Sequence, residues 1–406
     1  TILKVLSLSY WYPPANIPAS TRAVGIAQEL QGRGFEIEVL AIKHKNYSRE
    51  PWGDTPKVET SYIYDNIVTR ILHPSQCDSA FTSKLKAIAR LFAFIDYQVY
   101  SSLSTCYYIL TRARSRRYDF ILCSSPPFSF IIPAIIAKHV YGCRLIFDIR
   151  DTWAGNPYRS KLTLSFLYPI EYFIQFLLLL QADFITVVSN GMQKYLSKKH
   201  PSLRSRLIVC RNGVDSLNLG HSAICKPYRV NKDIQIVYTG NLYSGKRIVS
   251  PLLDSLNLST LKVTVTFYGS EQSIVTHLAS IYSNLNIIYV ARVDRTTCLR
   301  AQAEATVLLL LMGSDEINSF SLPAKFYEYV AAQKPILSIS PPEYEVSRLI
   351  TCYKLGLATT DMSKIMNFLD EIKQGRFSLP RTIPYELTRS SQVDVLVDRL
   401  AASAIH

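Results

Sequence analysis

The chain has 406 residues, of which 48% are hydrophobic and 19% charged, a composition that excludes a disordered or fibrous protein. This length exceeds one ordinary hydrophobic core and suits two domains. The 45 Lys and Arg residues outnumber the 31 Asp and Glu residues, which gives a net charge of +14. Such an excess favours an anionic partner: a nucleic acid, a nucleotide diphosphate or an acidic membrane surface.

The eight cysteines show no zinc-binding or redox pattern, because no two of them lie within four residues of each other. Cys123 lies in an apolar run, where cysteine usually acts as a small buried hydrophobe. We therefore expect a reducing cytoplasm. Residues 2–9 are too short for a signal peptide. The apolar segment 161–181 is interrupted by Pro169 and Glu171, so it falls short of a membrane span.

Short runs of β-branched residues alternate with helical patterns along the first half, which predicts a parallel sheet with crossover helices. The helix after the first strand carries apolar residues at Ala23, Ile26, Ala27 and Leu30, the spacing of one buried face. Strands are expected near residues 2–8, 36–42, 119–123, 144–148, 183–188 and 207–210.

A second series begins after a polar segment at residues 214–233. Its strands are expected near residues 234–239, 262–268, 286–290, 306–312, 335–340 and 356–359. Two consecutive series predict an α/β protein with two Rossmann-like, doubly wound domains and a hinge at about residues 212–234. Ligands of such sheets bind at the carboxyl ends of the strands, so a cleft between the domains is the expected site.

The first strand leads into a polar loop that opens a helix. Free backbone N–H groups and the positive end of the helix dipole suit a phosphate there, and Ser20 and Arg22 add a hydroxyl donor and a charged fork. The alternative is that Ser20 caps the helix and Arg22 is solvated. Neither strand–helix junction holds a dinucleotide fingerprint or a P-loop, which argues against a dehydrogenase and a P-loop NTPase.

Two further strands of the first half end in polar residues. One ends at Ser125 in a Ser-Pro-Pro sequence, and the next ends at Asp148, Arg150 and Asp151. Asp148 and Arg150 share one face by side-chain alternation, and Arg150 favours the ionised form of a nearby carboxylate. Such a carboxylate can act as a base or hold a sugar hydroxyl. The alternative is a structural Asp–Arg pair that braces the loop.

In the second half, one strand–helix junction carries Gly240, which permits close backbone approach, and Lys246, which can meet a phosphate. A later helix begins near Pro323, a favoured first-turn residue. Lys325 lies in its first turn, where a cation is unfavourable unless an anion lies there too. Glu328, one turn further, can accept hydrogen bonds from a ribose diol. The alternative is a surface pair of Lys325 and Glu328.

Seven short motifs, in this order, resemble glycosyltransferase family 4, especially bacterial members that build cell-surface polysaccharides. They are the loop 12–22 that ends Ser-x-Arg, Ser-Pro-Pro at 125–127, Arg-Asp-x-Trp at 150–153, Ala-Asp-x-Ile-Thr-Val-Val-Ser at 182–189, Asn-Gly-Val-Asp at 212–215, Tyr-Thr-Gly-Asn-Leu at 238–242 and Pro-x-Lys-x-x-Glu-Tyr at 323–329. Each motif is weak alone, and the specificity comes from their order.

The resemblance implies the GT-B fold and a retaining transfer from a nucleotide diphosphate sugar, the co-substrate, without a metal ion or other cofactor. By analogy Lys246 neutralises the leaving diphosphate. Helix amides near Pro323 hold the same phosphates with Lys325 nearby, and Glu328 binds the donor ribose. The acceptor domain is expected to span residues 1–213, and the nucleotide-sugar domain residues 214–387.

An amphipathic helix near residues 390–402 is expected to return to the first domain, as in GT-B relatives, so that residues 388–406 join it.

Two residues depart from the family pattern at the donor site. Phe320 stands where members often carry a second glutamate, and Asn241 replaces a usual arginine. Lys325 and Arg247 are expected to compensate. A His-bearing acceptor loop is also replaced, by residues 148–151. Two alternatives to an active transferase stay open: a degenerate relative that binds a nucleotide sugar or a partner enzyme without turnover, and a nucleotide-sugar epimerase.

Residues 84–117 combine bulky apolar and aromatic residues with basic clusters, which suits an interfacial helix pair on an anionic bilayer near a polyprenyl-linked or other glycan acceptor. The alternative is a pair of core helices with a solvated basic cap. Nucleic-acid binding is disfavoured, because no recognition motif accompanies the charge. We expect a cytoplasmic protein, with peripheral association at the inner face of the cell membrane as an extension. The basic residues are Lys84, Lys86, Arg90, Arg112, Arg114, Arg116 and Arg117.

Overall fold

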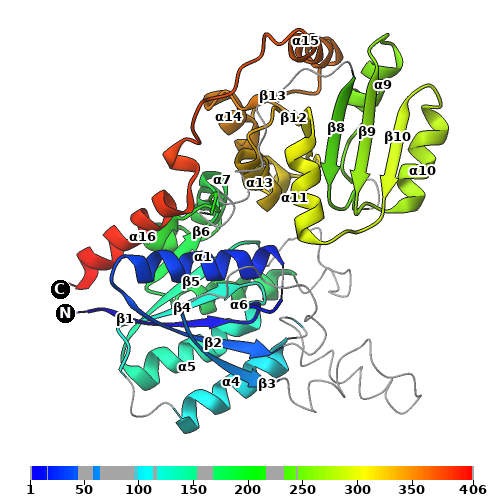
Figure 1. Cartoon of the computed structure of the whole chain (residues 1–406). Coiled ribbons are helices and arrows are strands. Elements are labelled where there is room, and N and C mark those ends of the chain that lie inside the picture. The colour runs from blue at the N-terminus through cyan, green and yellow to red at the C-terminus, as the bar shows by residue number, and fades with distance from the viewer. Residues whose placement is uncertain are drawn as a thin grey trace, which may run out of the picture. The chain divides into compact units, whose positions relative to one another are not determined.

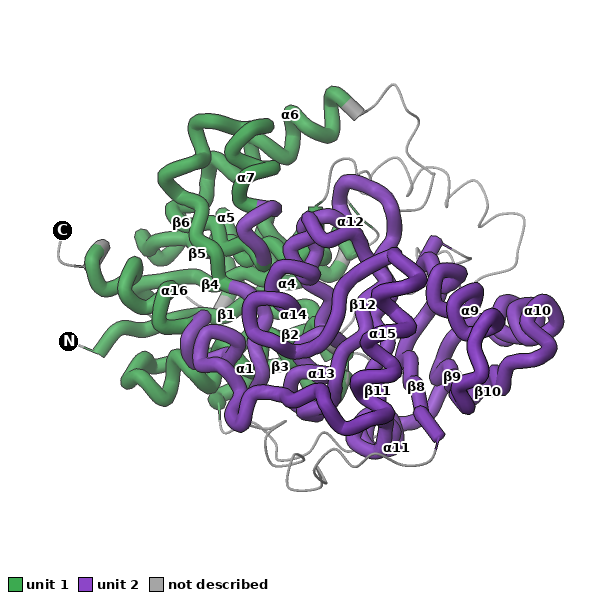
Figure 2. The backbone as a smooth tube through the Cα atoms, turned by 90° about the horizontal axis from the view of Figure 1, so that it is seen from above, with its two compact units in different colours: residues 1–188, 193–210, 393–406 green, residues 189–192, 211–392 purple. Residues whose placement is uncertain are grey.

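The computed structural model describes residues 2–15, 17–43, 58–64, 96, 98–112, 117–152, 168–215, 233–243 and 246–404. The chain divides into two compact units (Figure 2). Unit 1 comprises Thr1–Val188, Gln193–Cys210 and Val393–His406, and unit 2 comprises Ser189–Met192 and Arg211–Gln392. Each unit contains one parallel sheet between helices (Figure 1), which is the α/β architecture expected from the sequence.

Unit 1 is built on a seven-stranded parallel sheet of order β3-β2-β1-β4-β5-β6-β7. Its strands are β1 (Lys4–Ser9), β2 (Glu36–Lys43), β3 (Glu59–Tyr64), β4 (Phe120–Ser125), β5 (Arg144–Ile149), β6 (Phe184–Val187) and β7 (Leu207–Val209). The sequence analysis missed β3. This edge strand pairs on one side only, with β2, and its sequence ETSYIY lacks the apolar run of a central strand.

Different helices cover the two faces of this sheet. Helices α1 (Pro18–Gly32) and α16 (Arg389–Ala404) share a core with Ile146 of β5, to which α16 contributes Leu396 and Leu400. The neighbouring Phe147 points the other way, since side chains alternate along a strand. It lines a small apolar cavity with residues of α5 (Ile131–Tyr141) and α6 (Tyr168–Leu179). The amphipathic segment expected at 390–402 is therefore a helix, and its residues from Val393 onward belong to unit 1.

The second face is completed by α4 and α7. Helix α4 (Val99–Arg112) packs against α5 and the short helix η1 (Phe128–Phe130), where the Ser102 hydroxyl donates to the Ser129 hydroxyl at 3.0 Å. Helix α7 (Asn190–Lys199) lies beside α6: the ring of His200, the residue after α7, stacks on the ring of Phe176 in α6 at 5.2 Å. A short helix, η3 (Pro201–Arg206), leads into β7. Figure 1 shows α4 and α5 opposite α1 and α16 across the sheet.

Unit 2 is built on a six-stranded parallel sheet of order β10-β9-β8-β11-β12-β13. Its strands are β8 (Ile234–Thr239), β9 (Val263–Tyr268), β10 (Asn286–Val290), β11 (Val307–Leu311), β12 (Ile336–Ile339) and β13 (Gly356–Ala358). The strand order reverses between β8 and β11, and ligands of such sheets bind beside the carboxyl ends of the strands at this reversal.

The helices of unit 2 also cover both faces of its sheet, in two separate apolar cores. They are α9 (Ser250–Asn257), α10 (Gln272–Ile281), α11 (Arg295–Glu304), α12 (Glu316–Phe320), α13 (Ala324–Ala332), α14 (Glu345–Cys352), α15 (Met362–Lys373) and the short η5 (Tyr385–Leu387).

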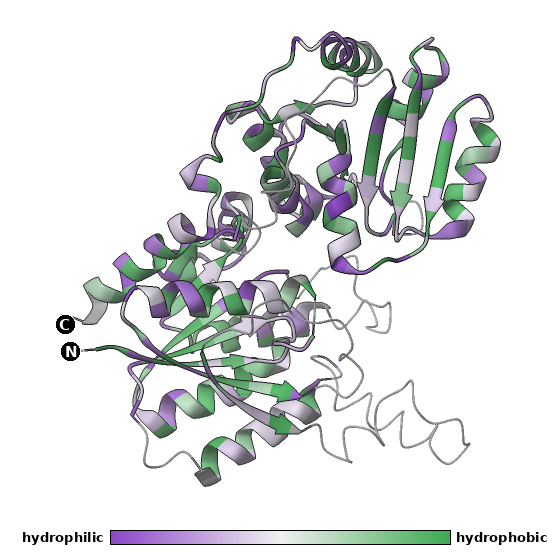
Figure 3. Cartoon of the chain, viewed as in Figure 1, coloured by the Kyte–Doolittle hydropathy of each residue, from purple (hydrophilic) through white to green (hydrophobic). Residues whose placement is uncertain are grey.

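The sequence pattern explains most of these elements. The strand β11 reads Val-Leu-Leu-Leu-Leu and is buried throughout, as expected for a central strand covered on both faces. Figure 3 shows the same contrast between apolar strands and helices with one polar face. Each of the twelve strands expected from the sequence forms, with ends within two residues of the prediction. Gly356 lets β13 approach β12, because a Cβ there would lie 1.9 Å from the Ile336 oxygen.

Some expectations lie outside the described residues. They include half of the basic segment 84–117 and most of the hinge at 212–234. No helix in the described part of the chain is both long and apolar enough to cross a bilayer.

Candidate functional site

The candidate site of unit 2 lies where β8 and β11 end. The chain turns after β8 at Gly240, whose positive φ of 115° favours glycine. Two contacts hold this turn: the Ser270 hydroxyl donates to the Gly240 oxygen at 2.7 Å, and the Leu242 N–H donates to the Glu271 carboxylate at 2.8 Å. The turn is thus tied to the segment that follows the neighbouring strand β9.

Lys325 brings the two donor-site motifs of the sequence together. It lies in the first turn of α13, and its Nζ sits 4.1 Å from the centroid of the Tyr238 ring at the end of β8. A Cβ at position 240 would lie only 2.9 Å from this Nζ, so Gly240 provides the room for the ammonium group. A cation over a tyrosine face is attracted by the ring quadrupole.

Arg247 adds a second cation near the ends of these strands. Its Nη1 donates to the Leu311 oxygen at the end of β11, at 3.1 Å, and to Oδ1 of Asn318, at 2.8 Å. Burial and the nearby Arg247 guanidinium lower the pKa of Lys325 to about 7. An anion at this point would raise the pKa of Lys325 again, because an opposite charge nearby favours the protonated form.

The start of α13 contributes backbone donors to the same place. Pro323 is the N-cap residue and makes no side-chain cap hydrogen bond. The first N–H groups of a helix have no intrahelical acceptors, and the helix dipole is positive at that end. Lys325, Arg247 and the start of α13 therefore form a cationic site that suits a phosphate or diphosphate.

Glu328 lies one turn further along α13 and faces α11. Its Oε1 accepts from Arg295 Nη1 at 2.9 Å, and its Oε2 accepts from Gln302 Nε2 at 3.3 Å. Its ion pair is therefore with Arg295, and the carboxylate is only 18% exposed. The alternative, a surface pair of Lys325 and Glu328, does not form. Arg295 and Gln302 were missed in the sequence, because neither belongs to a recognisable motif.

Gln302 extends this network to the end of β8. Its Nε2 also donates to the Thr239 hydroxyl at 3.2 Å, and that hydroxyl lies 3.2 Å from the Tyr329 hydroxyl. The side chain is fully buried, and its Oε1 has no hydrogen-bond partner among the described residues. Glu328 is thus held from two sides beside the cationic site.

Lys246 and Asn241 are both exposed at the turn after β8. The Asn241 backbone oxygen accepts from the Tyr238 hydroxyl at 2.7 Å, which orders the turn without using the amide side chain. The catalytic role of Lys246 and the donor-binding role of Asn241 stay predictions.

Phe320, at the position of the second family glutamate, is a packing residue. It is buried, and a Cβ on Gly191 would lie 2.1 Å from its own Cβ. The Phe320 side chain therefore occupies space against the backbone at Gly191, and that approach requires glycine.

In unit 1, Arg22 and Asp148 form a buried ion pair with each other, and not the separate phosphate and catalytic sites predicted from the sequence. Arg22 Nε and Nη2 donate to the Asp148 carboxylate at 2.9 and 2.6 Å, and Nη2 also donates to the Cys210 oxygen. The side chains are 1% and 0% exposed.

The Asp148 carboxylate also accepts hydrogen bonds from the Ser124 and Thr186 hydroxyls. Burial raises the pKa of Asp148, but Arg22, the Thr186 hydrogen bond and the charge of Arg150 together hold it below its usual range. The pair is therefore structural in this arrangement. It replaces the predicted roles of Arg22 in phosphate binding and of Asp148 in catalysis.

The other predicted residues of unit 1 lie at the carboxyl edge of its sheet. Arg150 donates from Nε to the Ser125 oxygen and from Nη2 to the Pro126 oxygen, at 3.0 and 2.7 Å. Asp151 is exposed. Helix α1 begins at Pro18 with Ile17 as its N-cap, so Ser20 is not the cap. The buried hydroxyls of Ser20 and Ser125 have no hydrogen-bond partner among the described residues.

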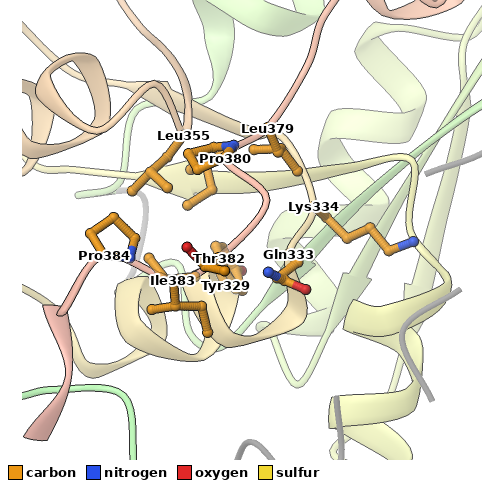
Figure 4. A pocket seen from close by; sticks show the side chains of 11 residues that line it. Tyr329, Gln333, Lys334, Leu355, Leu379, Pro380, Thr382, Ile383 and Pro384 are labelled. Atoms are coloured by element: carbon orange, nitrogen blue, oxygen red, sulfur yellow. The ribbon is translucent and has the colours of Figure 1, made fainter. Parts of the chain in front are cut away.

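Two other features of the described residues do not form a site. A cavity of unit 2 is lined by apolar groups of α13, β12 and residues 379–384, and Lys334 extends away from its other labelled side chains (Figure 4). Because this lining is mostly apolar, the cavity is best explained as imperfect packing between these elements. Within the described ranges, no group of three or more His, Cys, Asp or Glu side chains is placed to hold a metal ion.

Comparison with solved structures identifies the fold as GT-B, the two-domain class of glycosyltransferases. The lipopolysaccharide outer core galactosyltransferase WaaB in its apo form superposes with a TM-score of 0.60 at 13% identity, over 99% of this chain and 100% of that one. HepE of Anabaena in complex with UDP and glucose gives 0.60 at 12% identity, over 99% and 100%. The catalytic domain of starch synthase IV from Arabidopsis thaliana, bound to ADP and acarbose, gives 0.62 at 10% identity, over 100% of both chains.

A family model matches the first part of the chain: residues 19–216 match Glycosyltransferase Family 4. This match and the GT-B fold are consistent with the family that the seven motifs suggested. Comparison with curated protein sequences gives no match.

Proposed function

We propose that the protein is a retaining glycosyltransferase that moves a sugar from a nucleotide diphosphate sugar to a glycan or lipid-linked acceptor. The observation that carries the proposal is the cationic site of unit 2, where Lys325, Arg247 and the start of α13 gather beside Glu328. Lys325 and Arg247 repel each other, and the nearby Glu328 carboxylate is already paired with Arg295. An added anion offsets this repulsion, and a diphosphate is the anion that this chemistry fits.

The site residues have distinct roles in this proposal. Lys325, Arg247 and the amides of α13 offset the negative charge that grows on the departing diphosphate, which is electrostatic stabilisation of the transition state. Glu328 accepts hydrogen bonds from the ribose hydroxyls, with Arg295 and Gln302 orienting it. The proposal uses no metal ion.

Unit 1 supplies the acceptor site in this proposal. Ser20, Ser125, Arg150 and Asp151 lie at the carboxyl edge of its sheet, where ligands of such sheets bind. We further propose a role in surface polysaccharide biosynthesis at the inner face of the cell membrane. The resemblance to bacterial family members and the net charge of +14 support this role.

One observation favours a second candidate. Phe320 is a packing residue, so the carboxylate that family members often carry at this position is missing. Its absence is what we would expect of a protein that binds a nucleotide sugar without turnover. A nucleotide-sugar epimerase is a third option. Incubation with a panel of nucleotide sugars and glycan acceptors, followed by product analysis, separates them: the proposal expects a glycosylated acceptor. An unchanged donor or an epimerised donor in every incubation would contradict it.

Glu328→Gln is expected to weaken binding of the matching nucleotide by about 1.5–3 kcal/mol, because hydrogen bonds to a charged acceptor are the stronger ones. Isothermal titration measures the change. Glu304→Gln, an exposed carboxylate on the neighbouring α11, serves as the control. Equal affinity in Glu328→Gln and the wild type, with the fold intact, would remove Glu328 from the nucleotide site.

Lys246→Ala is expected to lower kcat/KM about tenfold and to change donor affinity less, because an exposed cation acts mainly on charge that develops during the reaction. Steady-state kinetics and nucleotide titration give the two values. Lys262→Ala makes the same charge change at the exposed start of β9, the opposite end of the strands. If both variants behave alike, Lys246 acts only through the overall charge of the protein.

A further inference from the structure

One helical layer of unit 1 is almost free of acidic residues. The four helices α4, α5, α6 and α7 cover one face of its sheet. They contain five Lys and Arg residues against a single acid, Glu171, which is 1% exposed. Asp183, in the loop after α6, is neutralised by Lys138 at 2.8 Å. The outer surface of this layer is therefore positive.

The same layer exposes large apolar side chains in two helical stripes. On α6 they are Ile170, Phe173 and Leu177, at 49%, 60% and 44% exposure. On α4 they are Leu103, Tyr107 and Leu110. Spacings of three, four and seven residues place each set along one side of its helix. Exposed apolar residues gathered in this way mark an interaction surface, whereas single ones do not.

Lysines border the α6 stripe. Lys194, Lys198 and Lys199 of α7 are exposed, and within the described part of the chain none of them forms an ion pair. Lys199 lies over the rings of Tyr172 in α6 and Tyr195 in α7, so its ammonium group is held where the two helices meet. Apolar and cationic groups thus alternate across neighbouring helices.

The opposite face of the same sheet lacks both features. Helix α16 carries Asp394 and Asp398 beside its arginines, and α1 carries Glu29, which pairs with Arg33. Helix α15 of unit 2 ends with Asp370 and Glu371 among its lysines. The acid-free layer is therefore a local property of α4–α7 and not a consequence of the basic composition of the whole chain.

We infer that the outer face of α4–α7 docks on an anionic lipid bilayer. The apolar stripes enter the boundary between headgroups and acyl chains, while the α7 lysines contact anionic headgroups. A bilayer fits better than a second copy of the chain, because two copies of a positive face repel each other. This surface is set by described residues and differs from the segment 84–117, although α4 overlaps that segment. It does not depend on catalysis.

The test is co-sedimentation of the whole protein with vesicles of phosphatidylcholine alone or of three parts phosphatidylcholine to one part phosphatidylglycerol. We expect binding to the anionic vesicles and its loss as salt rises, because exposed charges are screened. Each basic residue near an anionic surface is worth about a fivefold change in binding, so Lys194→Gln/Lys198→Gln/Lys199→Gln should reduce it on the order of 100-fold at low salt. Ile170→Ser/Phe173→Ser/Leu177→Ser should reduce it at least tenfold.

Matched controls lie on unit 2. Lys354→Gln/Lys364→Gln/Lys373→Gln removes the same charge, and Leu258→Ser/Ile281→Ser removes exposed apolar groups; both should bind vesicles as the wild type does. Nucleotide titration of every variant reports the fold and the donor site separately. A failed membrane test therefore leaves the proposed sugar transfer standing and removes only its proposed location at the membrane.

Three results would overturn the inference. The first is equal vesicle binding by the α6 and α7 variants and their controls. The second is loss of binding only in Arg112→Ser/Arg114→Ser/Arg116→Ser/Arg117→Ser. The third is a change of oligomeric state, and not of vesicle binding, in the α6 variant, which would mean that the apolar stripe packs against a second copy.

Discussion

Lys325→Met is expected to lower kcat/KM by about 10²–10³-fold, the loss found when one donor that stabilises transition-state charge is removed. Methionine keeps an apolar stem over Tyr238, so the packing of α13 should survive while the charge is lost. The effect should exceed that of Lys246→Ala. Lys325 is partly buried at the start of a helix, where charges are screened less than at the exposed turn.

The pH dependence gives a second measurement of the same residue. Without an anion the pKa of Lys325 is about 7, so the side chain loses its proton as the pH rises above that value. A diphosphate favours the protonated form, so binding takes up a proton at high pH. Affinity for a nucleoside diphosphate should then fall between pH 7 and pH 9, by at most about tenfold per unit, a range in which the phosphate's own ionisation near pH 6 is complete.

Two variants separate this effect from a general one. Lys325→Arg stays charged throughout the range and should bind with little pH dependence, because arginine keeps its proton. Lys262→Met, at the other end of the strands, should keep the slope of the wild type. A wild-type slope in Lys325→Met would assign the titration to another group and would remove Lys325 from the phosphate site.

The fold was largely predictable because both sheets are parallel. Buried parallel strands read as continuous apolar runs, and the Val-Leu-Leu-Leu-Leu of β11 leaves little choice. The edge strand β3 lacks this signal: it is paired on one side only, and in its sequence three polar residues precede Tyr-Ile-Tyr. Its formation depends on pairing with β2, a tertiary contact that no local pattern records.

The cationic site of unit 2 was predictable only where a local rule is broken. Gly240 and the early lysine of α13 break local rules, since a cation at a helix start is unfavourable alone. The contact between Lys325 and Tyr238 then follows from the topology, which brings the end of β8 beside α13. Arg295 could not be predicted, because its partner Glu328 is 33 residues away and neither residue specifies the other.

The pairing of Arg22 with Asp148 shows residues that looked functional in the sequence but form a structural ion pair. Each residue has a plausible role in its own motif, Arg22 toward a phosphate and Asp148 toward a catalytic base. Alternation placed Asp148 on one face of β5 but could not show that α1 would bring a guanidinium against it, 126 residues away in sequence. A charge that looks available in one motif can thus be neutralised by another.

Asp148→Ala is expected to lower the free energy of unfolding by about 3–5 kcal/mol, because it leaves the Arg22 guanidinium buried without its partner. Urea denaturation measures the loss. A lowered carboxyl pKa stabilises the fold above its ordinary value near 3.8 and ceases to do so as the pH falls through the depressed value. The loss of stability in Asp148→Ala should therefore be full at pH 7 and shrink in strong acid.

The exposed pair of Lys4 and Glu36, at 2.8 Å, provides the control: Glu36→Ala should cost under about 1 kcal/mol, since both side chains are solvated. The double variant Arg22→Met/Asp148→Leu should recover most of the stability that Asp148→Ala loses, because it removes both charges and leaves apolar groups of similar size. A catalytic Asp148 predicts a different result, with turnover abolished and the unfolding transition unmoved. If Asp148→Ala unfolds at the wild-type urea concentration, Arg22 and Asp148 are not the structural pair described above, and Asp148 returns to the candidates for the acceptor site.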